Sequence, residues 1–234
     1  MRVLVIIPAY REEKTIAAVI RAVKAQHFEV LVVDDCSPDR TCEVARQCGA
    51  TVLRLPSNLR YGGALQTGYL YARDNNYDAV VQLDADGQHD PACIPDLLAP
   101  ILSGEADVAM GSRFLGGQNY PMPLARKLGQ WIFGGVAQWQ TGLRITDPTT
   151  GFQALSRKVI SANCTNVFSE DFPDADMIIT LHRMGFRIKE VPVRMYISEG
   201  ASMHGGIIKP LYYIYKMSIA MLIARFRSVD KEPL

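Results

Sequence analysis

Short apolar runs alternate with longer segments of helical periodicity through the first half of the chain. The apolar runs, rich in β-branched residues, predict strands at residues 3–7, 30–33, 51–55, 79–83 and 107–110. Apolar positions at helical spacing predict helices between them, at residues 12–26, 39–48, 62–75 and 91–102. This alternation predicts an α/β fold with a mostly parallel, Rossmann-like sheet and helices on both of its faces.

The alternation becomes less regular after Gly111. A loop of turn-forming residues comes first. Beyond it the pattern predicts a helix at residues 124–141, a short strand at 149–155, a helix at 174–184 and a strand at 187–196. Fewer crossovers and more loops are typical of a substrate-binding half that lies beside a nucleotide-binding half.

Composition narrows the class of protein. The chain has 234 residues, 48% of them hydrophobic, which supports a full core. Its net charge of +1 excludes a general basic surface for nucleic acid. Five cysteines, an odd number without a Cys-x-x-Cys pair, indicate reduced thiols. No apolar run is long enough to span a bilayer.

Two acidic pairs follow predicted strands. Asp34 and Asp35 end the strand at 30–33, and Asp84-Ala85-Asp86 follows the strand at 79–83. In a parallel sheet both pairs lie at the same carboxyl edge, where open α/β sheets bind ligands. Carboxylates there suit Mg²⁺ or Mn²⁺ completed by substrate phosphates. Taken singly, each pair is also what a turn or a helix cap requires.

Other candidates are expected at the same edge. Tyr10 and Glu12 follow the first strand, where they suit a nucleoside or simply begin a helix. Gly63 lies in a glycine pair that opens a helix and leaves room for a diphosphate, although a plain tight turn looks the same. Arg113 follows the fifth strand, and its guanidinium suits a phosphate.

Two later segments carry further candidates. The stretch 146–152 is a turn by composition, and its functional interpretation puts hydroxyls, including that of Thr149, and Asp147 beside a sugar. The acidic stretch 169–176 is either solvated or the source of a general base, with Asp171, Asp174 and Asp176 as candidates.

These motifs, in this order, resemble those of inverting glycosyltransferases of family 2, which have the GT-A fold. The shared motifs are Pro-Ala-Tyr-x-Glu, Val-Asp-Asp-x-Ser, Gly-Gly-Ala and Asp-Ala-Asp-Gly-Gln-His, and the resemblance runs from Met1 to about Arg227. Within the family the chain is most similar to polyprenyl-phosphate sugar transferases such as dolichyl-phosphate mannose synthase. Residues 111–113, 146–152 and 188–193 match that branch.

The resemblance implies a donor site, a metal site and an acceptor site. Together with the residues above, the predicted nucleotide-binding set is Pro8, Tyr10, Glu12, Asp34, Asp35, Gly63, Asp84 and Ala85. The cation, Mg²⁺ or Mn²⁺, is assigned to Asp84, Asp86 and Gln88. The predicted acceptor-binding residues are Arg113, Arg126, Thr149 and Arg194, and the predicted catalytic residues are Asp86, Arg113, Asp171 and Asp174. The loop at 198–206 lacks the Arg and Lys that many relatives carry there, so the resemblance rests on more shared residues for the donor than for the acceptor.

We therefore predict a single GT-A domain over residues 1–234. Residues 1–110 form the nucleotide-sugar half, residues 111–206 the acceptor half, and residues 207–227 a C-terminal helix. The expected reaction is inverting, metal-dependent transfer from a UDP-, GDP- or dTDP-sugar to a polyprenyl phosphate. Transfer to a saccharide hydroxyl remains open, as does a sugar-nucleotide-binding scaffold without turnover. A nucleotidyltransferase is disfavoured because no basic, glycine-rich triphosphate loop follows the first strand.

The C-terminal helix bears on location. Residues 211–224 are apolar almost all round, rich in tyrosine, and flanked by Lys209, Arg225 and Arg227. Such a helix suits a membrane interface, and the prediction is a cytoplasmic enzyme peripheral to the inner face of the membrane. The alternatives are a helix packed in the core and a contact in a homo-oligomer.

Overall fold

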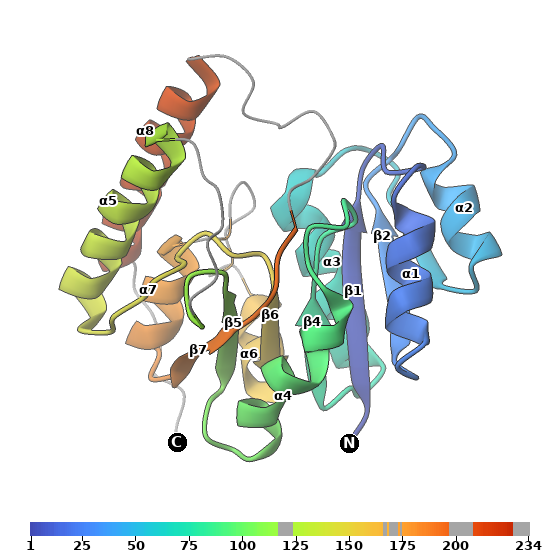
Figure 1. Ribbon diagram of the computed structural model, residues 1–234, viewed down its shortest axis with the longest axis horizontal. Helices are drawn as coiled ribbons and strands as arrows, with labels where there is room; N and C mark the ends of the chain where they lie inside the picture. The colour runs from blue at the N-terminus through green and yellow to red at the C-terminus, as the bar shows by residue number, and fades with distance from the viewer. Residues whose placement is uncertain (117–123, 166–167, 169–172, 174, 197–207, 227–234) are drawn as a thin grey trace.

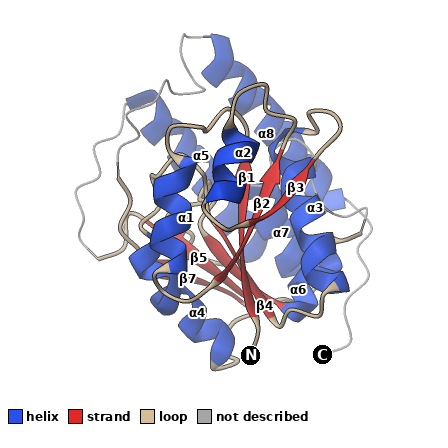
Figure 2. Ribbon diagram, turned by 90° about the vertical axis from the view of Figure 1, so that its right-hand side faces the viewer, coloured by secondary structure: helices blue, strands red, loops and turns tan. Residues whose placement is uncertain are grey.

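The computed structural model describes residues 1–116, 124–165, 168, 173, 175–196 and 208–226. Within this part, one sheet has the strand order β3-β2-β1-β4-β6-β5-β7 (Figures 1 and 2). Its strands are β1 (Val3–Ala9), β2 (Glu29–Asp34), β3 (Thr51–Arg54), β4 (Ala79–Gln82), β5 (Val108–Ser112), β6 (Gln153–Ser156) and β7 (Ile188–Pro192). Neighbouring strands are parallel except where β6 runs antiparallel between β4 and β5. The predicted mostly parallel α/β sheet is confirmed.

Helices cover both faces of the sheet, as predicted (Figure 2). One face carries α1 (Ile16–Lys24), α2 (Thr41–Gln47) and α4 (Ile94–Leu102), the last preceded by a short 3₁₀ turn, η1 (Pro91–Cys93). The other face carries α3 (Arg60–Asp74), α6 (Arg157–Asn163) and α7 (Ala175–Arg183). Beyond α7, α5 (Leu124–Thr141) and α8 (Ile208–Phe226) pack side by side as an outer layer, at the left of Figure 1.

The pleat of β1 explains why its sequence is a continuous apolar run. Leu4 and Ile6 pack under the α3 face, whereas Val5 and Ile7 pack under the α1 face. All four side chains are at most 1% exposed. A strand buried on both sides has no position for a polar residue, so it shows no alternation.

The second half differs from the prediction in detail. The strand predicted at residues 149–155 is shorter and later, because residues 146–151 form a turn before β6. Helix α6 was not predicted, since its seven residues carry too few apolar positions to show a period. The strand predicted at 187–196 ends at Pro192. In the part of the chain that the structure describes, every helix is too short or too polar to cross a bilayer.

Gly68 in α3 tests how tightly this helix packs on β1. A Cβ atom at Gly68 would lie 2.6 Å from Ile6 Cγ2, whereas a Cβ atom at Gly135 in α5 would meet nothing within 4 Å. Overpacking costs about 1–3 kcal/mol, which outweighs the gain of about 1 kcal/mol in helix propensity. We expect Gly68→Ala to lower the free energy of unfolding in urea and Gly135→Ala to raise it. Equal midpoints for the two variants would contradict this packing.

Candidate functional site

The candidate site lies where the chain reverses its direction of travel across the sheet. From β1 the chain passes outward to β2 and β3, and then returns to place β4 on the other side of β1. In open α/β sheets such a switch point leaves a crevice at the carboxyl ends of the strands, where ligands bind. The loops after β1, β2 and β4 all reach this edge, the upper one in Figure 1.

The loop after β4 presents two carboxylates that are already oriented by hydrogen bonds. Asp84 Oδ1 accepts a hydrogen bond of 2.9 Å from the Tyr61 hydroxyl. Asp86 Oδ1 accepts one of 2.9 Å from the Gln88 backbone N–H, and its Oδ2 accepts from the Gln88 side-chain amide. Gln88, predicted as a metal ligand, thus directs its amide nitrogen at Asp86, while Ala85 between the two acids is buried.

His89 supports this loop from below. Its Nδ1 accepts a 3.0 Å hydrogen bond from the Asp84 backbone N–H, and its ring stacks on Phe152 with the centroids 5.0 Å apart. Burial lowers the pKa of His89 to about 4, so the imidazole is neutral at pH 7. The structure therefore places His89 beside the acids as a packing and hydrogen-bonding partner.

Glu12 brings a third carboxyl group to this edge. Its backbone N–H donates to Thr41 Oγ1 at 2.8 Å, and its Oε2 accepts from the Thr15 hydroxyl at 2.7 Å. Burial raises the pKa of Glu12, and the negative charges of Asp86 and Asp84 raise it further. The pKa of Asp84 is raised by its own burial, against the opposing hydrogen bond from Tyr61. The sheet therefore holds a local concentration of negative charge here.

The other predicted donor residues lie around these acids. Tyr10 follows β1 and is 42% exposed, whereas Pro8 is buried within the strand. Asp35 is buried and accepts a 2.6 Å hydrogen bond from the backbone N–H of Leu59, immediately before α3. Asp34 is fully buried and pairs with Arg54 at 3.4 Å. Both aspartates thus make internal contacts, and their nucleotide-binding role stays a prediction.

The backbone at this edge is strained. Arg11, Cys36 and Arg60 have φ angles of 60°, 59° and 65°, in the left-handed region that L-residues rarely adopt. They lie directly after β1, after β2 and at the start of α3. Strain of this kind concentrates at functional sites, where surrounding contacts hold the backbone in place. A Cβ atom added at Gly63 would lie 2.6 Å from the Cβ atom of Leu59. Packing against Leu59 is therefore sufficient reason for a glycine at this position, and its predicted role at a diphosphate stays a prediction.

The second half of the chain contributes a buried ion pair. Arg113 donates to Asp147 through Nε at 2.6 Å and through Nη2 at 3.2 Å, and Gln130 donates to Asp147 at 3.0 Å. The sequence predicted Arg113 at an acceptor phosphate and Asp147 at a sugar, but not this pair. Glu190 on β7 was also missed. Its carboxylate accepts from both backbone N–H groups and the hydroxyl of the turn residues Thr146 and Asp147.

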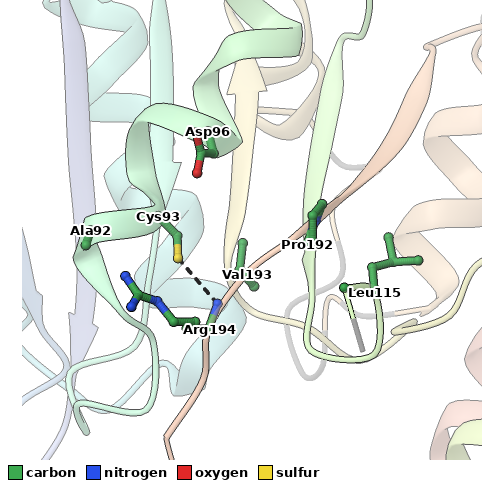
Figure 3. Close-up of a pocket in the computed structure, with 8 residues that line it drawn as sticks. Ala92, Cys93, Asp96, Leu115, Pro192, Val193 and Arg194 are labelled. Atoms are coloured by element: carbon green, nitrogen blue, oxygen red, sulfur yellow. Dashed lines mark hydrogen bonds between the residues drawn. The ribbon is translucent and has the colours of Figure 1, made fainter. Parts of the chain in front are cut away.

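The remaining predicted residues are more scattered. Arg194 pairs with Asp90 at 3.1 Å and lines a cavity of about 340 Å³ beside Cys93 and Asp96 (Figure 3). None of the predicted donor residues lines this cavity, so it is separate from the acidic edge. Thr149 lies in the turn before β6.

Three predicted residues are not placed. Arg126 belongs to the first turn of α5, and its side chain lies outside the described part of the chain. Asp171 and Asp174 also lie outside the described residues. Asp176, the third candidate base, is buried at the start of α7 with 5% of its surface exposed.

The carboxylates at the acidic edge are the candidate ligands for a divalent cation. Among the described residues, no three acidic, histidine or cysteine side chains converge as a complete metal site. Asp84 and Asp86 instead offer two oriented carboxylates, and 32% of the Asp84 side chain is exposed. Mg²⁺ and related cations are often held by one or two carboxylates together with substrate phosphates. The residues present fit a cation of that kind.

Comparison with known proteins agrees with the geometry. Residues 4–162 match the model of the family described as glycosyl transferase family 2. The undecaprenyl-phosphate mannosyltransferase of Micrococcus luteus is 33% identical over 89% of this chain and 90% of that protein. The polyprenol monophosphomannose synthase of Mycolicibacterium smegmatis is 29% identical over 97% of this chain and 91% of that protein.

A solved structure extends the comparison to the fold. Glucosyl-3-phosphoglycerate synthase from Mycobacterium tuberculosis, in complex with Mn²⁺ and UDP-glucose, superposes with a TM-score of 0.71. It is 21% identical, and the alignment covers 96% of this chain and 78% of that one. At this identity the likeness is one of fold, and the predicted GT-A fold is confirmed.

Glu190 tests how the turn at 146–151 is held. Glu190→Ala removes the acceptor of two backbone N–H groups, and each such group left unpaired in a buried site costs about 1–3 kcal/mol. We expect a loss of at least about 2 kcal/mol in urea unfolding. The matched control is Lys189→Ala, which removes an exposed ion pair with Glu105 worth about 0–1 kcal/mol. Equal losses in the two variants would contradict the role of Glu190.

Proposed function

Because the chain belongs to glycosyltransferase family 2, we propose that it transfers a sugar from a nucleotide-sugar donor to a polyprenyl phosphate. The transfer inverts the anomeric carbon and uses Mg²⁺ or Mn²⁺. The observation that carries the proposal is the pair of oriented carboxylates, Asp84 and Asp86, at the switch point of the sheet, near enough to Glu12 to raise its pKa. The two polyprenyl-linked relatives, similar over about nine-tenths of their length, support the lipid acceptor.

The donor fits the acidic edge from β1 to β4. Tyr10, which is 42% exposed, offers an aromatic ring to a nucleoside base. Asp84 and Asp86 would hold the cation, which neutralises charge that develops on the departing nucleoside diphosphate. The solved synthase with Mn²⁺ and UDP-glucose supports the same donor chemistry on this fold.

The acceptor determines whether a base is needed. A phosphate monoester is already ionised at pH 7, so its oxygen attacks the anomeric carbon without losing a proton. The bond from that carbon to the donor diphosphate breaks as the new carbon–oxygen bond forms, and the nucleoside diphosphate leaves with the electron pair. A saccharide hydroxyl would instead require a carboxylate base. With a lipid phosphate as acceptor, the guanidinium of Arg113 would orient the attacking group.

The outer layer of helices offers a surface for the membrane that carries such an acceptor. On α5, Trp131 and Trp139 are 78% and 71% exposed, and on α8, Leu222, Ile223 and Phe226 are 57%, 54% and 75% exposed. We call these five residues the apolar stripe. Arg225 joins the two helices, since its guanidinium lies 4.6 Å from the centroid of the Trp139 ring.

Charge on the same helices supports an anionic lipid surface as the partner. Neither α5 nor α8 contains an aspartate or glutamate, whereas both contain lysine and arginine, including the exposed Lys127 and Arg225. Tryptophan beside basic residues is typical of membrane interfaces, and each cation near an anionic membrane contributes about 1 kcal/mol. The location at the inner, cytoplasmic face stays a prediction, as does a homo-oligomer.

A donor panel tests the reaction. The full chain is incubated with UDP-, GDP- and dTDP-sugars, with Mg²⁺ or Mn²⁺, and with undecaprenyl or dolichyl phosphate. We expect one donor to give a lipid-linked product of inverted anomeric configuration, measured by NMR. Chelation should stop the reaction, and Asp86→Ala should slow it at least about 100-fold.

The control for this panel is Asp74→Ala, an exposed acid at the end of α3. It should keep wild-type turnover. Product formed only on a saccharide hydroxyl would contradict the lipid acceptor. Undiminished turnover after complete chelation would contradict the role of Asp84 and Asp86.

Vesicle sedimentation tests the apolar stripe. The double variant Trp131→Ala/Trp139→Ala should bind phosphatidylglycerol vesicles at least about tenfold more weakly than wild type, since each buried aromatic contributes about 1.5–3 kcal/mol. Leu102→Ala, which removes an exposed apolar residue from α4, is the control and should bind normally. Unchanged binding by the double variant would contradict the assignment. A dimer that dissociates on mutation would make the stripe a subunit contact instead.

A further inference from the structure

Tyr61 and Asp84 come from different elements and meet at the acidic edge. Tyr61 is in the first turn of α3, and Asp84 follows β4. The tyrosine hydroxyl donates to Asp84 Oδ1 at 2.9 Å. A hydrogen bond to an ionised oxygen is about twice as strong as one between neutral groups. Tyr61 therefore restricts the rotation of the carboxylate that it contacts.

Gly151 lies beside both the Tyr61 hydroxyl and the Asp84 carboxylate. A Cβ atom at Gly151 would lie 2.7 Å from the Tyr61 hydroxyl and 3.2 Å from each carboxylate oxygen of Asp84. The φ angle of Gly151 lies outside the left-handed region, so the backbone conformation does not require glycine here. Space requires it, because any side chain would enter the gap that Tyr61 and Asp84 share.

His89 is a third neighbour of Asp84. Its Nδ1 fixes the Asp84 backbone N–H at 3.0 Å, and its Nε2 lies 3.7 Å from Asp84 Oδ2. Main chain and side chain of Asp84 are thus held by different partners. The hydrogen bonds to Asp86, in contrast, come from its own loop, from Gln88 two residues further along the chain.

We infer that Tyr61 is a positioning residue for Asp84, and that Gly151 keeps the space in which this pair is formed. The inference rests on the proposed function, in which Asp84 contributes to holding the cation with the donor diphosphate. Residues that orient a metal-binding carboxylate set the affinity of the site without touching the metal, and their loss typically costs 10–100-fold. Tyr61 would therefore act on metal affinity, and through it on the donor.

The inference is tested by metal binding with the full-length protein. The probe is Mn²⁺, titrated alone and with UDP or GDP, and free Mn²⁺ is measured by electron paramagnetic resonance. Tyr61→Phe keeps the ring and removes the hydroxyl. We expect it to raise the Kd for Mn²⁺ by about tenfold, with a matching rise in the Mn²⁺ concentration required for half-maximal turnover.

Tyr77→Phe is the matched control. It removes another tyrosine–carboxylate hydrogen bond, the one of 2.7 Å to Glu29, which lies at the first residue of β2, at the opposite edge of the sheet. We expect Tyr77→Phe to leave the Kd for Mn²⁺ unchanged. A merely structural role for Tyr61 predicts the reverse of our expectation, that is, a lowered Tm in Tyr61→Phe with wild-type Mn²⁺ affinity.

Gly151→Ala provides a second, independent perturbation. The added methyl group should displace Asp84 and weaken Mn²⁺ binding, whereas Gly135→Ala, in open space on α5, should not. Because both changes act on one carboxylate, the effects of Tyr61→Phe and Gly151→Ala should not add in the double variant.

The outcomes separate the two proposals. Wild-type Mn²⁺ affinity in Tyr61→Phe would overturn the inference and leave the proposed function standing. A wild-type protein that binds no Mn²⁺, even with UDP or GDP, would overturn both. Additive losses in the double variant would overturn the shared action of Tyr61 and Gly151 on Asp84.

Discussion

Like charge is the constraint at one edge of the sheet, where Asp84 and Asp86 lie near enough to Glu12 to raise the pKa of its carboxyl group. The parallel pairing of β1 with β4 imposes this proximity. Ile6 pairs with Gln82, the last residue of β4, and β1 continues to Ala9, so the loop that carries Asp84 and Asp86 emerges beside the end of β1. Hydrogen bonds oppose the repulsion one group at a time, from Thr15, from Tyr61 and from Gln88. If a cation binds there, as we propose, its positive charge would relieve the repulsion that these hydrogen bonds leave.

The direction of β6 decides what else reaches that edge. β6 runs antiparallel to β4, with Gln153 opposite Gln82 and Ser156 opposite Ala79. The start of β6 therefore lies at the end of β4, and the turn before it arrives beside Asp84. Had β6 been parallel, this turn would lie at the opposite edge of the sheet, and neither Gly151 nor Asp147 would lie at the acidic edge. The reversed direction of β6 is therefore what brings the turn at residues 146–151 to the acids.

Local patterns predicted most of the elements, though not α6, and the acids at the carboxyl edge, because both depend on short-range signals. Parallel strands end at a common edge, so acids placed after two of them must lie near each other. The contacts that sequence reasoning missed join residues far apart in the chain. Tyr61 and Asp84 are separated by 23 positions, Arg113 and Asp147 by 34, and Thr146 and Glu190 by 44. From the sequence, Gly151 could be predicted only as a turn residue. The need for a glycine there comes from Tyr61 in α3 and Asp84 after β4, which are distant in the chain.

Helix α5 lies between the exposed outer surface and the Arg113–Asp147 pair, so one helix separates the two. Gln130 faces inward and donates to Asp147, the partner of Arg113, while the next residue, Trp131, faces outward. Successive residues of an α-helix point about 100° apart, and the helix is about 10 Å across. If the apolar stripe lies on a membrane, as we propose, the inner side of the same helix meets the Arg113–Asp147 pair. The short distance matters because a polyprenyl phosphate has its chain in the bilayer and only its head group outside. An enzyme that reaches this head group needs the arginine that orients the phosphate close to the lipid. With the apolar stripe on the membrane, only the thickness of α5 would separate Arg113 from the bilayer surface.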